Sequence, residues 1–318
     1  MNISILYGQT ATGKTAKAFE LAKHYDGEII NFDSRQIYKK LDIITGKDIP
    51  KDSKFEIRNQ NEHSTIGYFQ ISDFELRIST RLWLYDIIDP KESFSSADYV
   101  ACTMEVLTDI IKRGKTPILV GGTGYYLSHL LFGVPEVSVP ENKPLRDELN
   151  KKNVGELQTL LKEKNVPMFE EMNASDQKNP RRLIRRIEIT SQGKTLPHIP
   201  THETLSAKIG DLVGRSKGVT ITYLPFFHAS QEIVRAKIAL RVDQRLADGA
   251  LEEVKKLLAE GYTAADPGLN AIGYRQLIAY LHKEISLDEA KKDWINKEVQ
   301  YAKRQKTYFK KLFPATVC

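Results

Sequence analysis

The sequence of 318 residues predicts an α/β fold: a parallel sheet flanked by helices, with an all-helical insertion and a helical C-terminal part. Short apolar runs alternate with helical patterns over the first 132 residues, which is typical of a parallel sheet covered on both faces. From about residue 141 to 200 the patterns are helical only, and one further apolar run precedes a helical last third. We therefore expect a core of residues 1–138, a helical insertion domain of residues 139–200, and a return to the core in residues 201–318.

The first strand and helix enclose a phosphate-binding loop. The apolar run of residues 3–7 is followed by G-Q-T-A-T-G-K-T and then by a helical pattern, which is the strand–loop–helix setting that this motif requires. The glycines let the backbone wrap around an anion, successive N–H groups and the helix N-terminus point at it, and the lysine adds a charge. The fold is therefore predicted to be P-loop NTPase-like. A di- or triphosphate is expected to bind Gly8, Gln9, Thr10, Ala11, Thr12, Gly13, Lys14 and Thr15, with the Thr15 hydroxyl holding Mg²⁺.

A carboxylate follows the second apolar run, residues 28–32. Asp33 would then stand at the carboxyl end of a strand beside the P-loop strand, in the ligand crevice of an open α/β sheet and close to the bound phosphate. The residues alone leave three roles open for Asp33: a Mg²⁺ ligand, a helix N-cap, or a general base acting on an acceptor.

The remaining elements follow from periodicity and punctuation. Strands are expected at 2–7, 28–32, 83–88, 117–121 and 219–224, and the alternation of Phe74, Leu76 and Ile78 suggests a β-hairpin before the third. At the end of that third strand, Asp86 could serve as a second Mg²⁺ ligand, whereas Asp89 before Pro90 reads as a loop cap. Helices are expected at 14–24, 96–113, 125–132, 143–151, 154–164, 168–172, 180–191, 230–248, 249–260, 271–281 and 286–312, the second with a capping signal at residues 95–98.

Composition sets outer limits on the class of protein. No apolar run approaches 18 residues, so no transmembrane helix is expected, and the chain enters the P-loop strand too early for a signal peptide. The two cysteines, Cys102 and Cys318, suit a reducing cytoplasm without a disulfide framework, and no Cys/His spacing offers a zinc site.

The net charge of +6 is mild, but basic residues gather in two places. Residues 291–311 hold eight lysines and arginines with interleaved aromatics, and four arginines fall within residues 181–186 on one side of a predicted helix. A charge run is most often a solvated helix face, whereas two such clusters also fit a polyanion partner.

Six motifs in order resemble those of the tRNA dimethylallyltransferases. They are the P-loop with its Thr10, D-S-R-Q-I-Y from Asp33, V-G-G-T-G-Y-Y from Val120, N-P-R-R-L-I-R-R-I-E from Asn179, A-I-G-Y-R-Q from Ala271, and Q-Y-A-K-R-Q-K-T-Y from Gln300. The resemblance covers nearly the whole chain. It departs at Gln9, where the family usually has proline, at residues 44–48, where the I-G-T-A-K-P stretch is degraded, and over residues 49–81, which match poorly.

The resemblance implies a reaction and a partner. A dimethylallyl group would pass from dimethylallyl diphosphate to N6 of the adenosine at tRNA position 37, 3′ to the anticodon, with Mg²⁺ as cofactor. Asp33 would be the general base, and Lys14 and Thr15 would complete the catalytic set by stabilising the departing diphosphate. The anticodon stem-loop would be held on the insertion and the basic C-terminal helix, with its target base swung out of the stack. The residues implied to bind tRNA are Asp33, Ser34, Arg35, Gln36 (on the adenine edge), Thr123, Arg181, Arg182, Leu183, Ile184 and Arg185.

Three other functions compete with this interpretation. A P-loop kinase for a small molecule would share the loop, an adenylate dimethylallyltransferase would share the chemistry, and a tRNA-binding protein with a decayed site would share the basic surfaces. Intact Lys14, Thr15 and Asp33 argue against decay, and the helical insertion favours tRNA over free adenylate. We expect a cytoplasmic monomer.

Overall fold

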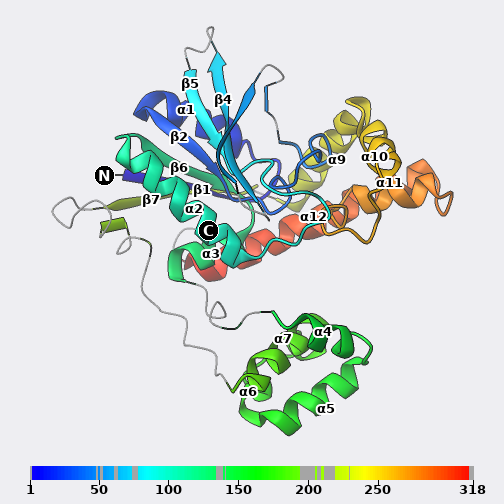
Figure 1. Ribbon diagram of the computed structural model, residues 1–318. Helices are drawn as coiled ribbons and strands as arrows, with labels where there is room; N and C mark the ends of the chain where they lie inside the picture. Colours follow the sequence, from blue (N-terminus) through cyan, green and yellow to red (C-terminus); the bar gives the residue numbers. More distant parts are fainter. Residues whose placement is uncertain are drawn as a thin grey trace. The chain divides into compact units, whose positions relative to one another are not determined.

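The computed structural model describes residues 2–47, 49–50, 53–60, 64–73, 78–133, 139, 141–193, 205, 209–210, 219–228 and 230–314. The chain forms two compact units, one of Met1–Leu131 with Glu203–Cys318 and one of Phe132–His202 (Figure 1). The insertion of residues 139–200 expected from sequence thus compares with 132–202 in the structure. No described helix is both long enough and apolar enough to cross a membrane.

The first unit is built on a seven-stranded sheet in the order β3-β4-β5-β2-β6-β1-β7. The strands are β1 (Asn2–Gly8), β2 (Gly27–Asn31), β3 (Lys54–Gln60), β4 (Thr65–Asp73), β5 (Ile78–Trp83), β6 (Thr116–Gly121) and β7 (Thr220–Phe226). The five strands from β5 to β7 in this order are parallel, and β4 and β3 continue the sheet in antiparallel pairing. A mostly parallel sheet flanked by helices confirms the predicted α/β class.

Two helices bury the centre of this sheet. Both α1 (Lys14–Tyr25) and α2 (Ser96–Lys112) contact β2 and β6, and β2 is buried along its whole length, so they cover opposite faces (Figure 1). Ala18 and Ala22 of α1 pack on Ile29 and Ile118. The predicted cap of α2 is confirmed, because Ser95 and Asp98 form a reciprocal capping box.

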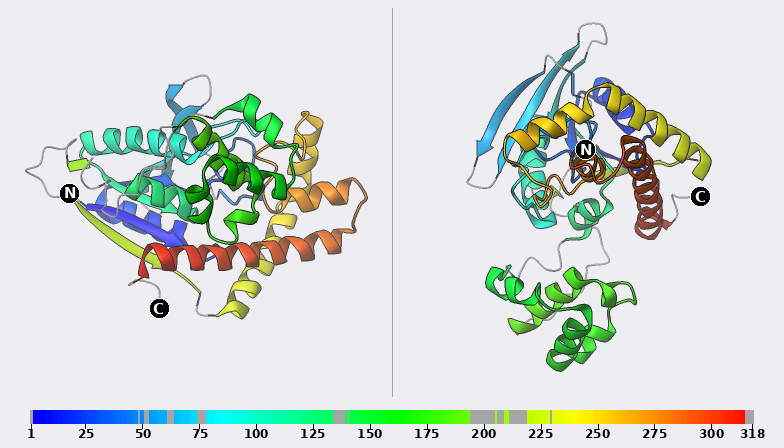
Figure 2. Two further views of the ribbon diagram at one scale, coloured as in Figure 1. Left: turned by 90° about the horizontal axis from the view of Figure 1, so that it is seen from below. Right: turned by 90° about the vertical axis from the view of Figure 1, so that its right-hand side faces the viewer.

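The remaining helices of the first unit lie close to their predicted bounds. They are α3 (Gly124–Phe132), α9 (Gln231–Ala247), α10 (Ala250–Ala259), α11 (Tyr274–Leu281) and α12 (Leu287–Leu312). The 26-residue α12, red in Figure 2, contacts α9, α11 and the P-loop strand β1. Inside this packing, the buried carboxylate of Glu298 pairs with Arg241 and with Arg245 at 3.0 Å, which ties α12 to α9.

Two sequence expectations about the sheet are wrong. β6 lies between β2 and the P-loop strand β1, so β2 is not beside β1. Residues 84–88 are not a strand: β5 ends at Trp83, and Leu84 and Asp86 have left-handed φ angles of 63° and 54°. Only Ile88 makes an isolated bridge, to Tyr38. The apolar run misled because it is buried without being part of the sheet.

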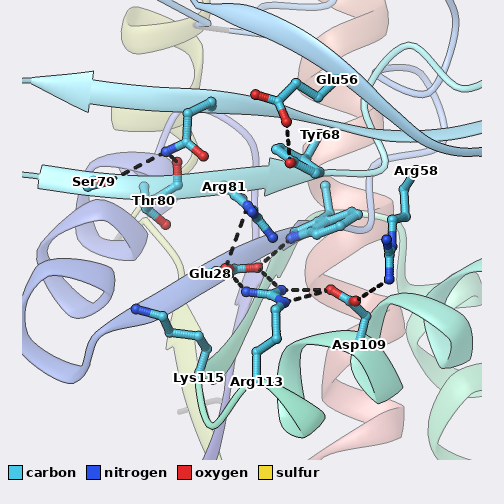
Figure 3. Close-up of polar contacts among 12 residues, drawn as sticks. Glu28, Glu56, Arg58, Tyr68, Ser79, Thr80, Arg81, Asp109, Arg113 and Lys115 are labelled. Carbon is cyan, nitrogen blue, oxygen red and sulfur yellow. Dashed lines mark hydrogen bonds and ion pairs between the residues drawn. The ribbon is translucent and has the colours of Figure 1, made fainter.

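The poorly matching segment forms the predicted antiparallel hairpin structure. β3 pairs with β4 and β4 with β5, although Phe74 and Leu76 lie outside the described residues. Figure 3 shows how this part is held: the buried Glu28 accepts two hydrogen bonds from Arg113, the C-cap of α2, at 2.5 and 2.6 Å, and one from Trp83 at 2.8 Å. Arg58 of β3 adds an ion pair to Asp109 of α2 at 3.2 Å. The extension is therefore anchored to α2, at the end of the sheet away from the P-loop.

The regular elements among the described residues of the second unit are all helical. It contains α4 (Lys143–Leu149), α5 (Val154–Lys164), α6 (Val166–Glu170), the 3-10 turn η1 (Asp176–Lys178) and α7 (Pro180–Ser191). Leu157 and Leu161 of α5 pack with Leu183 and Ile187 of α7 in its core. The fully buried Glu188 accepts hydrogen bonds from Arg146, Arg185 and the N–H of Asn142, each at 2.8 Å. Burial alone would raise the pKa of Glu188, but these donors outweigh it and the pKa is lowered.

Candidate active site

The P-loop presents an uncapped helix N-terminus. Gly13 is the N-cap of α1 with a φ of 82°, and no side chain caps its first turn, so N–H groups there are open to an anion. Gly8, at the other end of the loop, has a φ of 141°, and a Cβ built on it would lie 1.9 Å from the Phe226 carbonyl oxygen. The two glycines are thus required by conformation and by space. The geometry is that of a phosphate-binding loop.

The first part of the loop is bonded to the protein. The N–H of Gln9 donates to the Phe226 carbonyl at 2.9 Å, and the N–H of Thr10 donates to Oε1 of Gln305 at 2.9 Å. Both amides are therefore occupied within the protein, so the binding of a diphosphate by Gln9 and Thr10 stays a prediction. The open donors of the loop belong to its second part and to the first turn of α1.

The side chain of Lys14 is half-buried within the loop. Its Nζ donates to the Gln9 carbonyl at 2.5 Å and lies 3.3 Å from Oγ1 of Thr12. Burial lowers the pKa of Lys14 to about 7, the nearby Asp33 carboxylate opposes that shift, and Arg241 adds to it. A bound diphosphate would place negative charge next to the Lys14 ammonium and would therefore raise the pKa of Lys14 again.

Asp33 shares this site although its strand is not next to β1. The aspartate is half-buried after the end of β2, and its charge acts on the pKa of Lys14. Oδ1 accepts the N–H of Arg35 at 2.9 Å, which closes a turn rather than capping a helix. Within the part of the chain that the structure describes, Oδ2 has no hydrogen-bond partner. One carboxylate oxygen therefore holds the loop and the other can accept a proton.

The turn after β6 connects the segment that follows Asp33 to α12. Oγ1 of Thr123 accepts the N–H of Ser34 at 3.0 Å, and the side chains of Thr123 and Gln305 lie close enough to Tyr301 of α12 to act on its pKa. Burial, with Asp33 close by, raises the pKa of Tyr301 to about 12, so its phenol stays protonated near neutral pH. Asp33, Thr123 and the P-loop are thus linked through one turn of α12.

Comparison with known proteins now decides the family. A model described as IPP transferase matches residues 36–312, and one described as isopentenyl transferase matches residues 1–60. The chain belongs to the IPP transferase family. It is 35% identical over 313 residues to a tRNA dimethylallyltransferase of Anoxybacillus flavithermus, covering 98% of this chain and 88% of the relative. It is 33% identical over 311 residues to one of Endomicrobium trichonymphae, covering 98% and 92%. The crystal structure of a tRNA delta(2)-isopentenylpyrophosphate transferase from Staphylococcus epidermidis aligns with a TM-score of 0.60 at 28% identity, covering 97% of this chain and 90% of that one.

Several residues around the site of this IPP transferase were not predicted. Tyr301 and Gln305 belong to the Q-Y-A-K-R-Q-K-T-Y motif, but no site role was predicted for their side chains. Arg241 and Lys237 of α9 act on the site through charge, since Arg241 lowers the pKa of Lys14 and Lys237 that of the buried His228. The aromatic and amide positions within Q-Y-A-K-R-Q could have identified the first two, whereas no sequence pattern marks the two cations.

Other predicted polar contacts are partly occupied within the protein. Nε2 of Gln36 donates to the carbonyls of Thr45 at 3.2 Å and Gly46 at 2.7 Å, so its role on an adenine edge stays a prediction. Asp86 does not end a strand but pairs with the buried Lys47, which makes a Mg²⁺ role unsupported. Asp89 caps its loop as expected, accepting the N–H of Lys91 at 3.0 Å.

The predicted tRNA contacts on α7 divide into two groups. Arg181 and Arg182 are exposed. The side chains of Leu183 and Ile184 lie in the core of the helical unit, so the structure corrects their assignment as binding residues. Arg185 also turns inward, donating to Glu188 at 2.8 Å and to the Val139 carbonyl at 2.7 Å. The apolar positions of an amphipathic helix, not its charges, decide which arginines reach solvent.

Proposed function

We propose that the protein transfers the dimethylallyl group of dimethylallyl diphosphate to N6 of the adenosine at tRNA position 37, 3′ to the anticodon. The observation that carries the proposal is the half-buried carboxylate of Asp33, whose charge acts on Lys14 of an open P-loop, because this transfer needs a base beside a diphosphate. The names of the relatives support tRNA as the acceptor.

The chemistry follows from this pairing. The bond between the allylic carbon and the diphosphate oxygen breaks, and negative charge builds on the departing diphosphate. Amides of the first turn of α1 and the ammonium of Lys14 stabilise that charge in place. The N6 lone pair forms the new carbon–nitrogen bond, and the proton that N6 loses passes to Asp33. The products are N6-(dimethylallyl)adenosine in tRNA, diphosphate and a proton.

Mg²⁺ fits the oxygen donors available here. Thr15 lies half-buried in the first turn of α1, next to the anion site, and its hydroxyl would hold the ion together with diphosphate oxygens. The ion would offset charge on the leaving diphosphate. Among the acidic groups, Asp33 remains the base in this proposal, since its Oδ1 is already used to close a turn.

The tRNA would be bound mainly through phosphates. Arg181 and Arg182 on α7, and lysines and arginines of α12, supply cations on described surfaces of the two units. The proposed contacts of the extruded adenosine are Ser34, Arg35 and Gln36, which follow Asp33 in the chain, and Thr123, which accepts the N–H of Ser34. A tRNA substrate implies work in the cytoplasm, and we propose a monomeric enzyme.

One assay separates this function from its rivals. The protein is incubated with Mg²⁺, dimethylallyl diphosphate and unmodified tRNA, and the nucleosides are analysed by mass spectrometry. The mass of one dimethylallyl group should appear on adenosine, without ATP, and only in tRNA with an adenosine at position 37. Comparable turnover on AMP would indicate an adenylate dimethylallyltransferase, and phosphoryl transfer from ATP would indicate a kinase.

A further inference from the structure

One turn of α12 reaches both glycine-containing loops of the site. Gln305 is 5% exposed, and both polar atoms of its amide are used. Oε1 accepts the N–H of Thr10 in the P-loop at 2.9 Å, and Nε2 donates to the Gly122 carbonyl after β6 at 3.0 Å. A single buried side chain therefore bridges two segments that are far apart in the sequence.

The glycines after β6 make room for this helix. A Cβ on Gly122 would lie 2.2 Å from Nε2 of Gln305, and a Cβ on Gly124 would lie 2.4 Å from the ring of Tyr308. The motif G-G-T-G looks like a second phosphate loop, but its φ angles are not left-handed at these glycines. Its glycines are explained by the close approach of α12.

Gln9 makes a second set of bonds to the same surroundings. It is 1% exposed; its Nε2 donates to the Ala302 carbonyl of α12 at 3.1 Å, and its Oε1 accepts the N–H of His228 at 3.0 Å. The family usually has proline at this position. Proline restricts φ covalently, whereas Gln9 restrains the loop through hydrogen bonds to two other elements.

We propose that Gln305, assisted by Gln9, is a positioning residue that holds the first half of the P-loop in its diphosphate-binding shape before the donor arrives. This inference rests on the proposed function. It adds Gln305 of α12 to the residues that support the site, as a side chain that acts on the P-loop and not on the donor or the adenosine. By directing the Thr10 amide away from the anion site, Gln305 leaves the loop with one conformation. A ligand then binds without having to order it.

The test replaces the amide with an apolar chain of similar length, Gln305→Met. Kd for inorganic diphosphate is measured by calorimetry, and KM and kcat are measured with tRNA and dimethylallyl diphosphate. The melting temperature of each variant is measured separately. We expect Kd and KM to rise about tenfold or more, the effect of an unpaired buried amide, while kcat changes less than about twofold. The matched control is Tyr308→Phe, on the next turn of α12, which removes a hydrogen bond to Ser128 of α3 and should leave Kd and KM unchanged.

A second variant guards against a loss of folding. Gly122→Ala keeps Gln305 but pushes on its Nε2, so it should raise Kd in the same direction, and the double variant should cost less than the sum of the two. A lower melting temperature with unchanged Kd and KM in both variants would overturn the proposal. Because diphosphate binding needs no turnover, this result is separate from a failure of the wild-type protein to modify tRNA, which would instead refute the proposed function.

Discussion

Replacing Asp33 with asparagine tests the base directly. Asparagine keeps the oxygen that accepts the N–H of Arg35 at 2.9 Å, so the turn after β2 should persist. Only the proton acceptor and the negative charge are lost. We expect the rate of the chemical step to fall by about 10²–10⁴, the usual contribution of a general base, or about 3–5 kcal/mol in the activation free energy.

Single-turnover kinetics are the appropriate assay, with enzyme in excess over tRNA and saturating dimethylallyl diphosphate, so that binding and product release do not limit the rate. Asp89→Asn is the matched control: Asp89 also accepts the N–H two residues ahead, at 3.0 Å, but lies in another loop. Its variant should react at close to the wild-type rate.

Two results would refute this reasoning. A fall of less than tenfold for Asp33→Asn would mean that N6 loses its proton elsewhere. A large fall that is reversed by raising the Mg²⁺ concentration would assign Asp33 to the metal. The effect on Lys14 provides an internal check, because losing the Asp33 charge should lower the pKa of that lysine further below about 7.

Three further predictions follow from named contacts. Because free Lys14 loses its proton as the pH rises through about 7, Kd for inorganic diphosphate should increase above that pH by up to about tenfold per pH unit. Lys14→Arg should flatten this pH profile, and Lys14→Ala should abolish transfer of the dimethylallyl group. A Kd that does not change from pH 6 to 9 would contradict the role assigned to Lys14. Replacing Arg181 and Arg182 by alanine should reduce the slope of log K for tRNA binding against log salt concentration by roughly one per lost phosphate contact. Arg58→Ala, which removes an exposed cation on β3, is the control. Equal slopes for the two variants would show that Arg181 and Arg182 face solvent without contacting tRNA. Glu188→Gln should destabilise the helical unit by about 3 kcal/mol, since it disrupts a buried ion pair; hydrogen exchange should accelerate in α4 and α7, and unaltered exchange there would show that Gln replaces the carboxylate.

Local chemistry made the P-loop predictable. The motif is local, since its two glycines, lysine and threonine all lie within residues 8–15. The structure has positive φ angles at both glycines, as the motif requires. The position of Asp33 followed from a weaker rule: side chains at the carboxyl ends of parallel strands gather at one edge. That rule held even though β6 separates β2 from β1, because it depends on the edge and not on which strands are neighbours.

The misplaced strand and the misassigned side chains have a common cause. Hydrophobicity reports burial, and burial does not distinguish a strand from a crossing segment such as residues 84–88. On α7, charge was weighed without the apolar positions beside it. Leu183, Ile184 and Ile187 face the core, which fixes Arg185 near Glu188 and leaves Arg181 and Arg182 in solvent.

Tertiary contacts explain what no pattern could give. The hydrogen bond between Thr10 and Gln305 joins residues 295 positions apart. The sequence indicates that Gln305 lies on a helix, but not that this helix packs against the P-loop. The close approach of Nε2 of the same glutamine gives the glycine at position 122 a reason that phosphate binding does not supply. A motif of this kind is therefore composite: some positions are present for the reaction, and others because the element that completes the site must approach closely.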